Sequence, residues 1–214
     1  MNKFKNILFI IFLLNITSSF GQEKSKTDLM QVVRELIKSE KKKEHIKQVW
    51  WLPSIYWELA LKDSNLISED AANEIKLLIE KYNIIIIVDA NIGINGVAKN
   101  KIKKVNMIIN DKKYKPLKEV SDELTILIEA LKPTFTKMLG DYGKAIEIFV
   151  FDNLHKNKIF PDKIGEFTIK FDDSKFNYIL PLPSLIEKKM CPIDKKMLSG
   201  NWNYCPWHGK ELTQ

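Results

Sequence analysis

Five β-branched residues stand next to one another in the middle of the chain, from Ile84 to Val88. An uninterrupted run of this kind is typical of a strand that is buried on both faces and lies near the centre of its sheet. The fold must therefore supply neighbouring strands on both sides and a covering layer on each face. We expect the strand to end at Asp89, because the following sequence NIGING is typical of a turn.

The segments around this strand change irregularly between helical and extended patterns. Apolar residues at helical spacing follow Asp28, Ser68 and Ser121, each of which can cap a helix, and Pro53 suits the first turn of another helix. Residues 166–180 alternate apolar and polar side chains on both sides of a turn, which predicts an antiparallel hairpin. Since a regular strand–helix–strand order is lacking, these patterns predict an α+β fold with a mostly antiparallel sheet packed against several helices.

Three expectations concern where these elements end and pair. We expect the first helix to continue from residue 29 into the Lys-rich sequence KSEKKKEHIK, as far as about position 43. We expect residues 101–110 to form a strand that pairs back on the central one. The helix after Ser121 should end or kink at Pro133, because proline cannot donate a backbone hydrogen bond.

The N-terminus has the pattern of an export signal. Lys3 and Lys5 precede a short apolar run from Ile7 to Leu14, and small and polar residues follow as far as Gly21. This order of basic, apolar and cleavage regions predicts a cleavable signal peptide over residues 1–21. The apolar run is shorter than the roughly 20 residues that span a bilayer. We therefore expect a periplasmic or secreted protein with no transmembrane segment after cleavage.

The charged residues of the chain indicate which class of partner to expect. The chain has 34 basic and 27 acidic residues, and only Arg34 among the basic ones is an arginine. Proteins that read nucleic acids rely on the planar guanidinium group, so this composition does not favour a nucleic-acid partner. Lys-rich faces of an exported protein attract anionic surfaces weakly. We expect a partner in the cell envelope, either a protein or a glycan.

A cluster of aromatic residues follows the Lys-rich segment. The sequence VWWLPSIYW contains Trp50, Trp51 and Trp57 within eight positions. Large rings most often fill the core between secondary-structure elements, and we interpret the cluster in this way. The alternative is a glycan- or peptide-binding site at these three Trp residues.

The last part of the chain contains a short internal repeat. When residues 191–198 are set over residues 205–212, four of the eight positions are identical, namely the Cys, the Pro, one Lys and the final Leu. The sequence LPLPS before the repeat predicts an extended connector. We expect a domain over residues 22–185 and a separate C-terminal module over residues 186–214.

This tail resembles the zinc-ribbon family, in which two Cys-Pro-x-Cys knuckles bring four thiolates around one zinc ion. The resemblance covers about residues 190–212, with Asp194 and His208 in place of the second Cys of each knuckle. Carboxylates and imidazoles also bind zinc. The resemblance therefore implies a zinc site of Cys191, Asp194, Cys205 and His208, which would be structural because four protein ligands close it.

A disulfide is the competing interpretation of the same residues, and two reduced thiols without a metal are the third. Cys191 and Cys205 are the two cysteines of the chain, and a single pair is the expected count for one disulfide in an exported protein. In either case we expect Trp202, Tyr204 and Trp207 to pack the module, because so small a unit has little other core. Their alternative role is a platform for a sugar or a peptide.

The function expected from these features is that of a non-enzymatic binding or assembly protein of the cell envelope. Residues 22–185 resemble a secreted protein, and their pattern does not indicate a family of known activity. The sequence contains neither a GxSxG nor an HExxH motif. Two alternatives remain open: a glycan- or peptide-binding protein that uses the cluster at Trp50, Trp51 and Trp57, and a hydrolase with Asp89 in its site.

Overall fold

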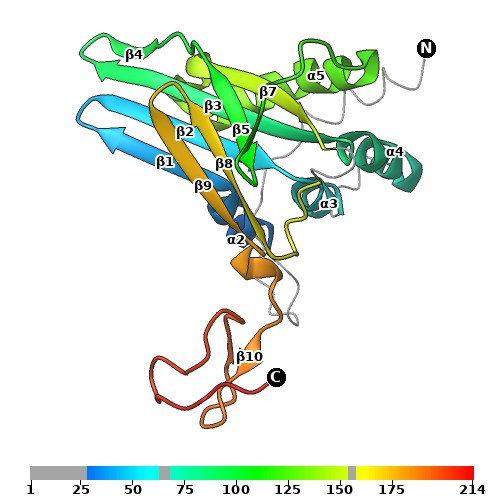
Figure 1. Ribbon diagram of the computed structural model, residues 1–214, viewed down its shortest axis with the longest axis vertical. Helices are drawn as coiled ribbons and strands as arrows, with labels where there is room; N and C mark the ends of the chain where they lie inside the picture. The colour runs from blue at the N-terminus through cyan, green and yellow to red at the C-terminus, as the bar shows by residue number, and fades with distance from the viewer. Residues whose placement is uncertain (1–27, 63–67, 154–157) are drawn as a thin grey trace.

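The computed structural model describes residues 28–62, 68–153 and 158–214 (Figure 1). The predicted signal peptide lies outside the described residues. Two antiparallel sheets and a set of helices form the main body, and a small C-terminal unit with two short strands follows it. The predicted α+β class with antiparallel sheets is confirmed. Among the helices of the described segments, none is long and apolar enough to cross a membrane.

The first sheet is built around the β-branched run. Strand β3 (Tyr82–Gly93) pairs with β2 (His45–Leu52) along one side, and β2 pairs with β1 (Ile37–Lys42). The other side of β3 is shared by β7 (Ile146–Asp152) and β4 (Gly96–Lys99), which pair with its first and last parts. All residues from 83 to 90 are buried. The prediction of a central strand buried on both faces is confirmed, although β3 continues past Asp89 to Gly93.

The second sheet lies against one face of the first. Its order is β6 (Lys112–Tyr114), β5 (Val105–Ile109), β8 (Gly165–Phe171) and β9 (Ser174–Leu180). The hairpin of β8 and β9 was predicted from its alternating pattern and is confirmed. The expected pairing of residues 101–110 with the central strand is wrong, because β5 pairs with β6 and β8.

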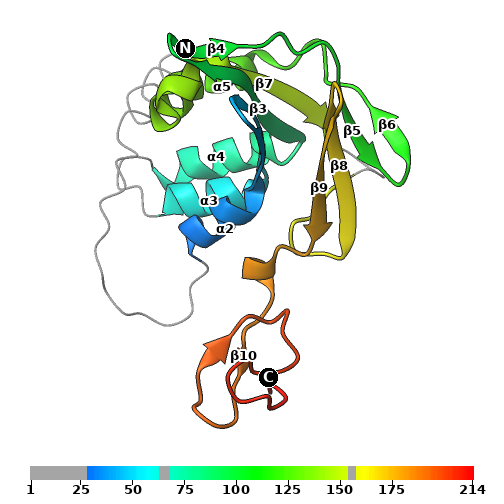
Figure 2. The same cartoon turned by 90° about the vertical axis from the view of Figure 1, so that its left-hand side faces the viewer.

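Helices cover the opposite face of the first sheet, as Figure 2 shows for α2 (Leu29–Leu36), α3 (Ser54–Lys62) and α4 (Glu69–Ile79). The hydroxyl of Ser68 accepts a hydrogen bond from the amide of Ala71, which confirms the predicted helix cap. Helix α5 (Asp122–Met138) begins after the predicted cap Ser121 and contains Pro133 within its length.

The first helix is shorter than its sequence pattern predicts. Helix α2 ends at Leu36, and Ile37 has an extended backbone. The Lys-rich segment that follows forms β1 and the turn into β2, so its interpretation as the polar end of a helix is wrong. These residues pair with β2, and tertiary contacts of this kind override a weak local preference for helix.

Two adjacent residues of β2 pack the first sheet against helix α5 on one face and against the second sheet on the other. Trp50 makes an edge-to-face contact with Phe135 of α5, with ring centroids 6.3 Å apart. Trp51 lies on the other face, where its ring is 4.8 Å from that of Phe167 and 5.7 Å from that of Tyr178 in the second sheet. Successive residues of a strand point to opposite faces, so one pair of indoles fills both sides of the core.

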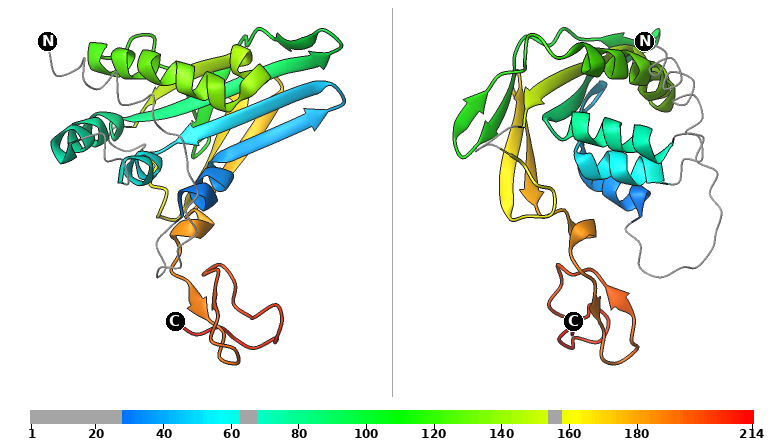
Figure 3. Two further views of the ribbon diagram at one scale, coloured as in Figure 1. Left: turned by 180° about the vertical axis from the view of Figure 1, so that it is seen from behind. Right: turned by 90° about the vertical axis from the view of Figure 1, so that its right-hand side faces the viewer.

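The C-terminal unit stands away from the main body and is joined to it by one chain segment (Figure 3). A short 3₁₀ turn, η4 (Pro183–Leu185), precedes it, and Ser184 donates hydrogen bonds from its amide and hydroxyl to the carboxylate of Glu35. Strands β10 (Lys189–Met190) and β11 (Met197–Leu198) pair within the unit. Its interior is a separate cluster of four buried residues, Cys191, Leu198, Cys205 and Leu212.

Candidate metal centre

The first half of the repeat folds into a tight knuckle that begins at Cys191. The amide of Cys191 donates to the carbonyl of Lys196 at 2.9 Å, and the amide of Lys195 donates back to the carbonyl of Cys191 at 2.9 Å. Lys195 has a positive φ of 60°. This backbone folds over the Cys191 side chain, which is fully buried.

The second half repeats the same pattern fourteen positions later. The amide of Cys205 donates to the carbonyl of Lys210 at 2.7 Å, and the amide of Gly209 donates to the carbonyl of Cys205 at 2.8 Å. Gly209 has a φ of 61°. The two knuckles therefore share one backbone design, and the sequence repeat is also a structural repeat.

The knuckles bring three possible metal ligands together. His208 Nδ1 lies 3.4 Å from the sulfur of Cys191 and 3.4 Å from the sulfur of Cys205, and the two sulfurs are 3.5 Å apart. Tetrahedral zinc with ordinary bond lengths would separate sulfur from nitrogen by about 3.6 Å and the two sulfurs by about 3.8 Å. The donor atoms are thus close enough to hold a metal ion between them.

The expectation of a disulfide between Cys191 and Cys205 is not met. The sulfurs are 3.5 Å apart, whereas an S–S bond is about 2.0 Å long, and both cysteines are free. The physical reason is the place of His208, whose ring nitrogen is equally distant from both sulfurs. The three atoms surround a shared centre instead of leaving the sulfurs to bond each other.

Asp194 is the fourth residue of the expected ligand set and lies beside the cluster. Its Oδ1 accepts a hydrogen bond from the amide of Lys196 at 3.2 Å, and its Oδ2 is 3.5 Å from the Lys196 ammonium. The Cys191 side chain lowers the pKa of Asp194 most, burial of the carboxyl opposes this effect and Lys196 adds to it, so the pKa of Asp194 is lowered overall. The three residues whose donor atoms converge are Cys191, Cys205 and His208.

Burial and backbone amides act in opposite directions on the pKa of the two thiols. Burial raises the pKa of the Cys191 thiol, and hydrogen bonds from the amides of Asp194 and Ile193 oppose this effect. Burial also acts against ionisation of Cys205, but the amides of His208 and Trp207 and the neighbouring side chains lower its pKa below the usual value. Cys205 is therefore the thiol that ionises more readily, and a thiolate is the form that binds metals.

The aromatic residues of the module do not form its interior. Trp202, Tyr204 and Trp207 are 43%, 62% and 68% exposed, so the expectation that they pack the module is wrong. The four residues of the buried cluster, two of which are the cysteines, fill the inside of this small unit. The rings are left at the surface because the knuckles turn their backbone and sulfurs inward.

The structure places the other aromatic candidates in the core. Trp50, Trp51 and Trp57 are all buried in the main body, which confirms their interpretation as core residues. Trp51 also donates a hydrogen bond from its indole nitrogen to Asn83 at 3.1 Å. The ring faces of these residues pack against protein, and the alternative of a ligand-binding site has no exposed indole at these positions.

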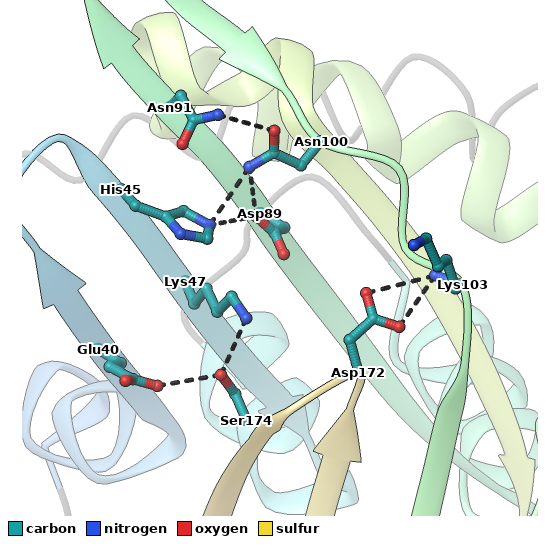
Figure 4. A network of polar contacts seen from close by, with 9 residues as sticks. All are labelled: Glu40, His45, Lys47, Asp89, Asn91, Asn100, Lys103, Asp172 and Ser174. Atoms are coloured by element: carbon teal, nitrogen blue, oxygen red, sulfur yellow. Dashed lines mark hydrogen bonds and ion pairs between the residues drawn. The ribbon is translucent and has the colours of Figure 1, made fainter.

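Asp89 lies inside β3, in a network of polar contacts near one end of the two sheets (Figure 4). Its carboxylate is buried, and His45 Nε2 lies 2.6 Å from its Oδ1. Asn100 donates to the same oxygen at 2.7 Å. No local sequence pattern predicts the contact of His45 with Asp89, because the two residues are 44 positions apart and only the β2–β3 register brings them together.

A second group of polar contacts lies beside the first and joins β1 and β2 to the second sheet. Lys47 donates from Nζ to the hydroxyl of Ser174 at 3.0 Å, and Ser174 donates to the carboxylate of Glu40 at 3.1 Å (Figure 4). Lys42, followed by Ser174, lowers the pKa of Glu40. Glu40 and Asp89 flank Lys47 in the strand register, so opposite charges alternate across three strands.

A cavity of about 220 Å³ lies elsewhere in the main body, between the segment before α5, the helix itself and β7. Its wall includes Leu117, Ile128 and Phe149. Neither Asp89 nor His45 is part of that wall, so the polar network and the cavity are separate features.

Comparison with models of known protein families, with curated proteins and with solved structures finds no significant match. The likeness of the tail to zinc ribbons therefore stays a resemblance in a few residues. The cluster of Cys191, Cys205 and His208 stands on its geometry alone.

Proposed function

We propose that this chain is an exported binding or assembly protein of the cell envelope whose C-terminal module is held together by a zinc ion. The observation that carries the proposal is the convergence of two thiols and an imidazole from two knuckles of identical backbone design. Export is proposed from the basic and apolar pattern of the first 21 residues.

The donor set favours zinc over the other common biological metals. Thiolate and imidazole ligands suit zinc, whereas calcium and magnesium take oxygen ligands. We assign Cys191, Cys205 and His208 as ligands and Asp194 as the fourth, because Asp194 occupies in the first knuckle the position that His208 has in the second. Four protein ligands leave no position for a substrate, so the ion would have a structural role.

A structural ion is consistent with the small size of the module. Its buried interior consists of four residues, two of them the proposed ligands. So small a core contributes little stabilisation, and units of this size are commonly stabilised by a disulfide or a metal. Zinc would bind the folded module far better than the unfolded chain, so metal binding would drive its folding.

The proposal is tested by measuring zinc content and titratable thiols on protein purified without chelators. We expect one zinc per chain, and loss of the metal in Cys205→Ser and His208→Ala. His45→Ala serves as the matched control, since it removes a histidine outside the module and should retain the ion. Wild-type protein without metal, or zinc that persists in both module variants, would contradict the proposal.

A hydrolase is the second candidate, favoured by the contact between His45 and Asp89. A buried carboxylate that holds a partly exposed imidazole is the arrangement that orients a general base. In this role His45 would accept a proton from water, and Asp89 would position the ring. A panel of chromogenic ester, phosphate and glycoside substrates tests the idea. Activity that is lost in His45→Ala and kept in His208→Ala would support it, and absence of turnover across the panel would reject it.

A further inference from the structure

The C-terminal module exposes an unusual share of large apolar side chains for its size. All five Trp of the chain lie in the described residues, and the two that are exposed, Trp202 and Trp207, both belong to residues 186–214. Contiguous exposed apolar groups on a soluble protein commonly mark an interaction surface. The exposed large apolar residues of the module are Ile193, Met197, Trp202, Tyr204 and Trp207.

Two of these rings lie together beside a positive charge. The rings of Trp202 and Trp207 are in contact, with centroids 6.3 Å apart and planes at 64°. The ammonium of Lys189 donates to the carbonyl of Trp202 at 3.1 Å, which holds this charge next to the aromatic pair. Residues 186–214 contain five Lys against three acidic side chains. The surface therefore combines interfacial aromatic groups with an excess of positive charge.

The aliphatic members of the set indicate which class of partner fits. Ile193 and Met197 are each more than half exposed. A sugar stacks on the face of a Trp but gains little from an exposed aliphatic chain. The boundary between lipid headgroups and acyl chains takes up both, since indole and phenol rings favour that interface and aliphatic side chains gain by burial there.

The position of the module allows contact with a flat surface. It extends beyond the two sheets at the end of a single connecting segment (Figure 3). Ile193 and Trp207 occupy the same position in the two knuckles, directly after the Cys-Pro pair. A protruding tip of this kind reaches a planar surface without displacing the main body.

We propose that the C-terminal module docks onto an anionic lipid surface, with Trp202 and Trp207 entering the headgroup region and Lys side chains facing the lipid charges. The proposal rests on the proposed function in one respect, since the zinc ion is what holds the two knuckles in the shape that presents these rings. Binding strength then depends on buried apolar area and on attraction to anionic lipid together.

The test is co-sedimentation of zinc-loaded protein with vesicles of phosphatidylcholine alone and of phosphatidylcholine mixed with phosphatidylglycerol. Both the full chain and the chain from Gln22 are used, so that any lipid binding by the apolar run of the predicted signal peptide is separated from binding by the module. We expect binding to the mixed vesicles that weakens with added salt. The double variant Trp202→Ser/Trp207→Ser should bind roughly tenfold more weakly or worse, in line with the apolar area lost. The control Ile94→Ser/Ile164→Ser removes exposed apolar residues of the main body and should bind like wild type.

Tryptophan fluorescence gives a second readout, because the other three Trp are buried. Anionic vesicles should shift the emission to the blue and protect it from acrylamide in the wild type but not in the double Trp variant. Zinc-loaded wild type that ignores anionic vesicles, or a double variant that binds as tightly as wild type, would overturn the docking proposal alone. Protection by soluble cell-wall glycan or by an acidic peptide without vesicles would also overturn it, in favour of that partner.

Zinc content is measured on every sample, so the two proposals fail in different ways. A double Trp variant with full zinc and weak vesicle binding supports both. Wild type that binds vesicles but contains no zinc overturns the proposal of a structural zinc ion. It would also show that zinc is not what holds the two knuckles in the shape of the docking surface.

Discussion

Lys195 and Gly209 occupy the same position in the two knuckles and have the same left-handed backbone, with φ of 60° and 61°. A β-carbon makes this conformation unfavourable by roughly 1 to 2 kcal/mol, and glycine avoids that penalty. The second knuckle thus has the residue that its backbone requires, whereas the first carries a strained lysine.

Lys195→Gly should therefore stabilise the module, and Gly209→Ala should destabilise it. We expect each change to shift the free energy of zinc binding by up to about 1 kcal/mol, which is about fivefold in affinity. Competition with a chromogenic chelator measures both. The exposed substitution Lys188→Gly lies before the first knuckle and serves as the control. Weaker zinc binding in Lys195→Gly would contradict the interpretation that the backbone of Lys195 is strained.

Replacing Asp194 should weaken zinc binding less than replacing His208. The carboxylate of Asp194 is shared with the amide and ammonium of Lys196, whereas the Nδ1 of His208 lies between both sulfurs. We expect a loss of at least roughly tenfold in zinc affinity for Asp194→Ala, because a water molecule can take the place of one carboxylate ligand, and a larger loss for His208→Ala. The same chelator titration ranks the two variants. The reverse order would show that Asp194 is the stronger ligand.

The hydroxyl of Tyr178 should make the main body sensitive to alkaline pH. It is buried within hydrogen-bond distance of the carbonyl oxygens of Leu36 (3.0 Å) and Val49 (3.2 Å), and burial raises the pKa of Tyr178 above its usual value of 10.0. The folded protein keeps the phenol proton at pH values where the unfolded chain releases it. Its contribution to stability is therefore complete below about pH 10 and is lost as the pH rises further.

Urea unfolding of wild type and Tyr178→Phe between about pH 8 and pH 11 tests this dependence. The variant should be less stable by about 1 to 3 kcal/mol at pH 8, because a buried hydrogen bond is lost, and its decline at high pH should be smaller. Burial also raises the pKa of Tyr56, to about 12, so the curve of Tyr56→Phe is measured beside the others to separate the contribution of Tyr56 to the decline at high pH. Parallel curves for Tyr178→Phe and wild type would rule out a role for Tyr178.

Two tryptophans of equal size should differ sharply in their effect on stability. Trp51 is completely buried between the sheets, and Trp51→Ala should cost about 3 to 5 kcal/mol. Trp207 is mostly exposed, and Trp207→Ala should stay within about 0.5 kcal/mol of wild type. Denaturant midpoints followed by circular dichroism measure both changes. A large loss for Trp207→Ala would mean that the ring packs the module after all.

Local patterns in the sequence were sufficient for several elements. The β-branched run predicted the central strand, the alternation around Asp172 predicted the β8–β9 hairpin, and Ser68 and Ser121 predicted the starts of two helices. The repeated Cys-Pro segments predicted a pair of related knuckles, and the resemblance to zinc ribbons implied converging donors, which the structure has for Cys191, Cys205 and His208. The strands, the hairpin and the helix caps depend on residues a few positions apart, so the local sequence carries the information for them.

Tertiary structure alone decided the features that depend on pairing between distant segments. The Lys-rich segment became β1 because β2 was available as its partner, and β5 joined the second sheet although it follows the first in the chain. The contact of His45 with Asp89 depends on strand register, which a one-residue shift would abolish. The exposure of Trp202 and Trp207 follows from the inward turn of the two cysteines, since so small a module has room inside for its sulfurs and two leucines but not for its indole rings.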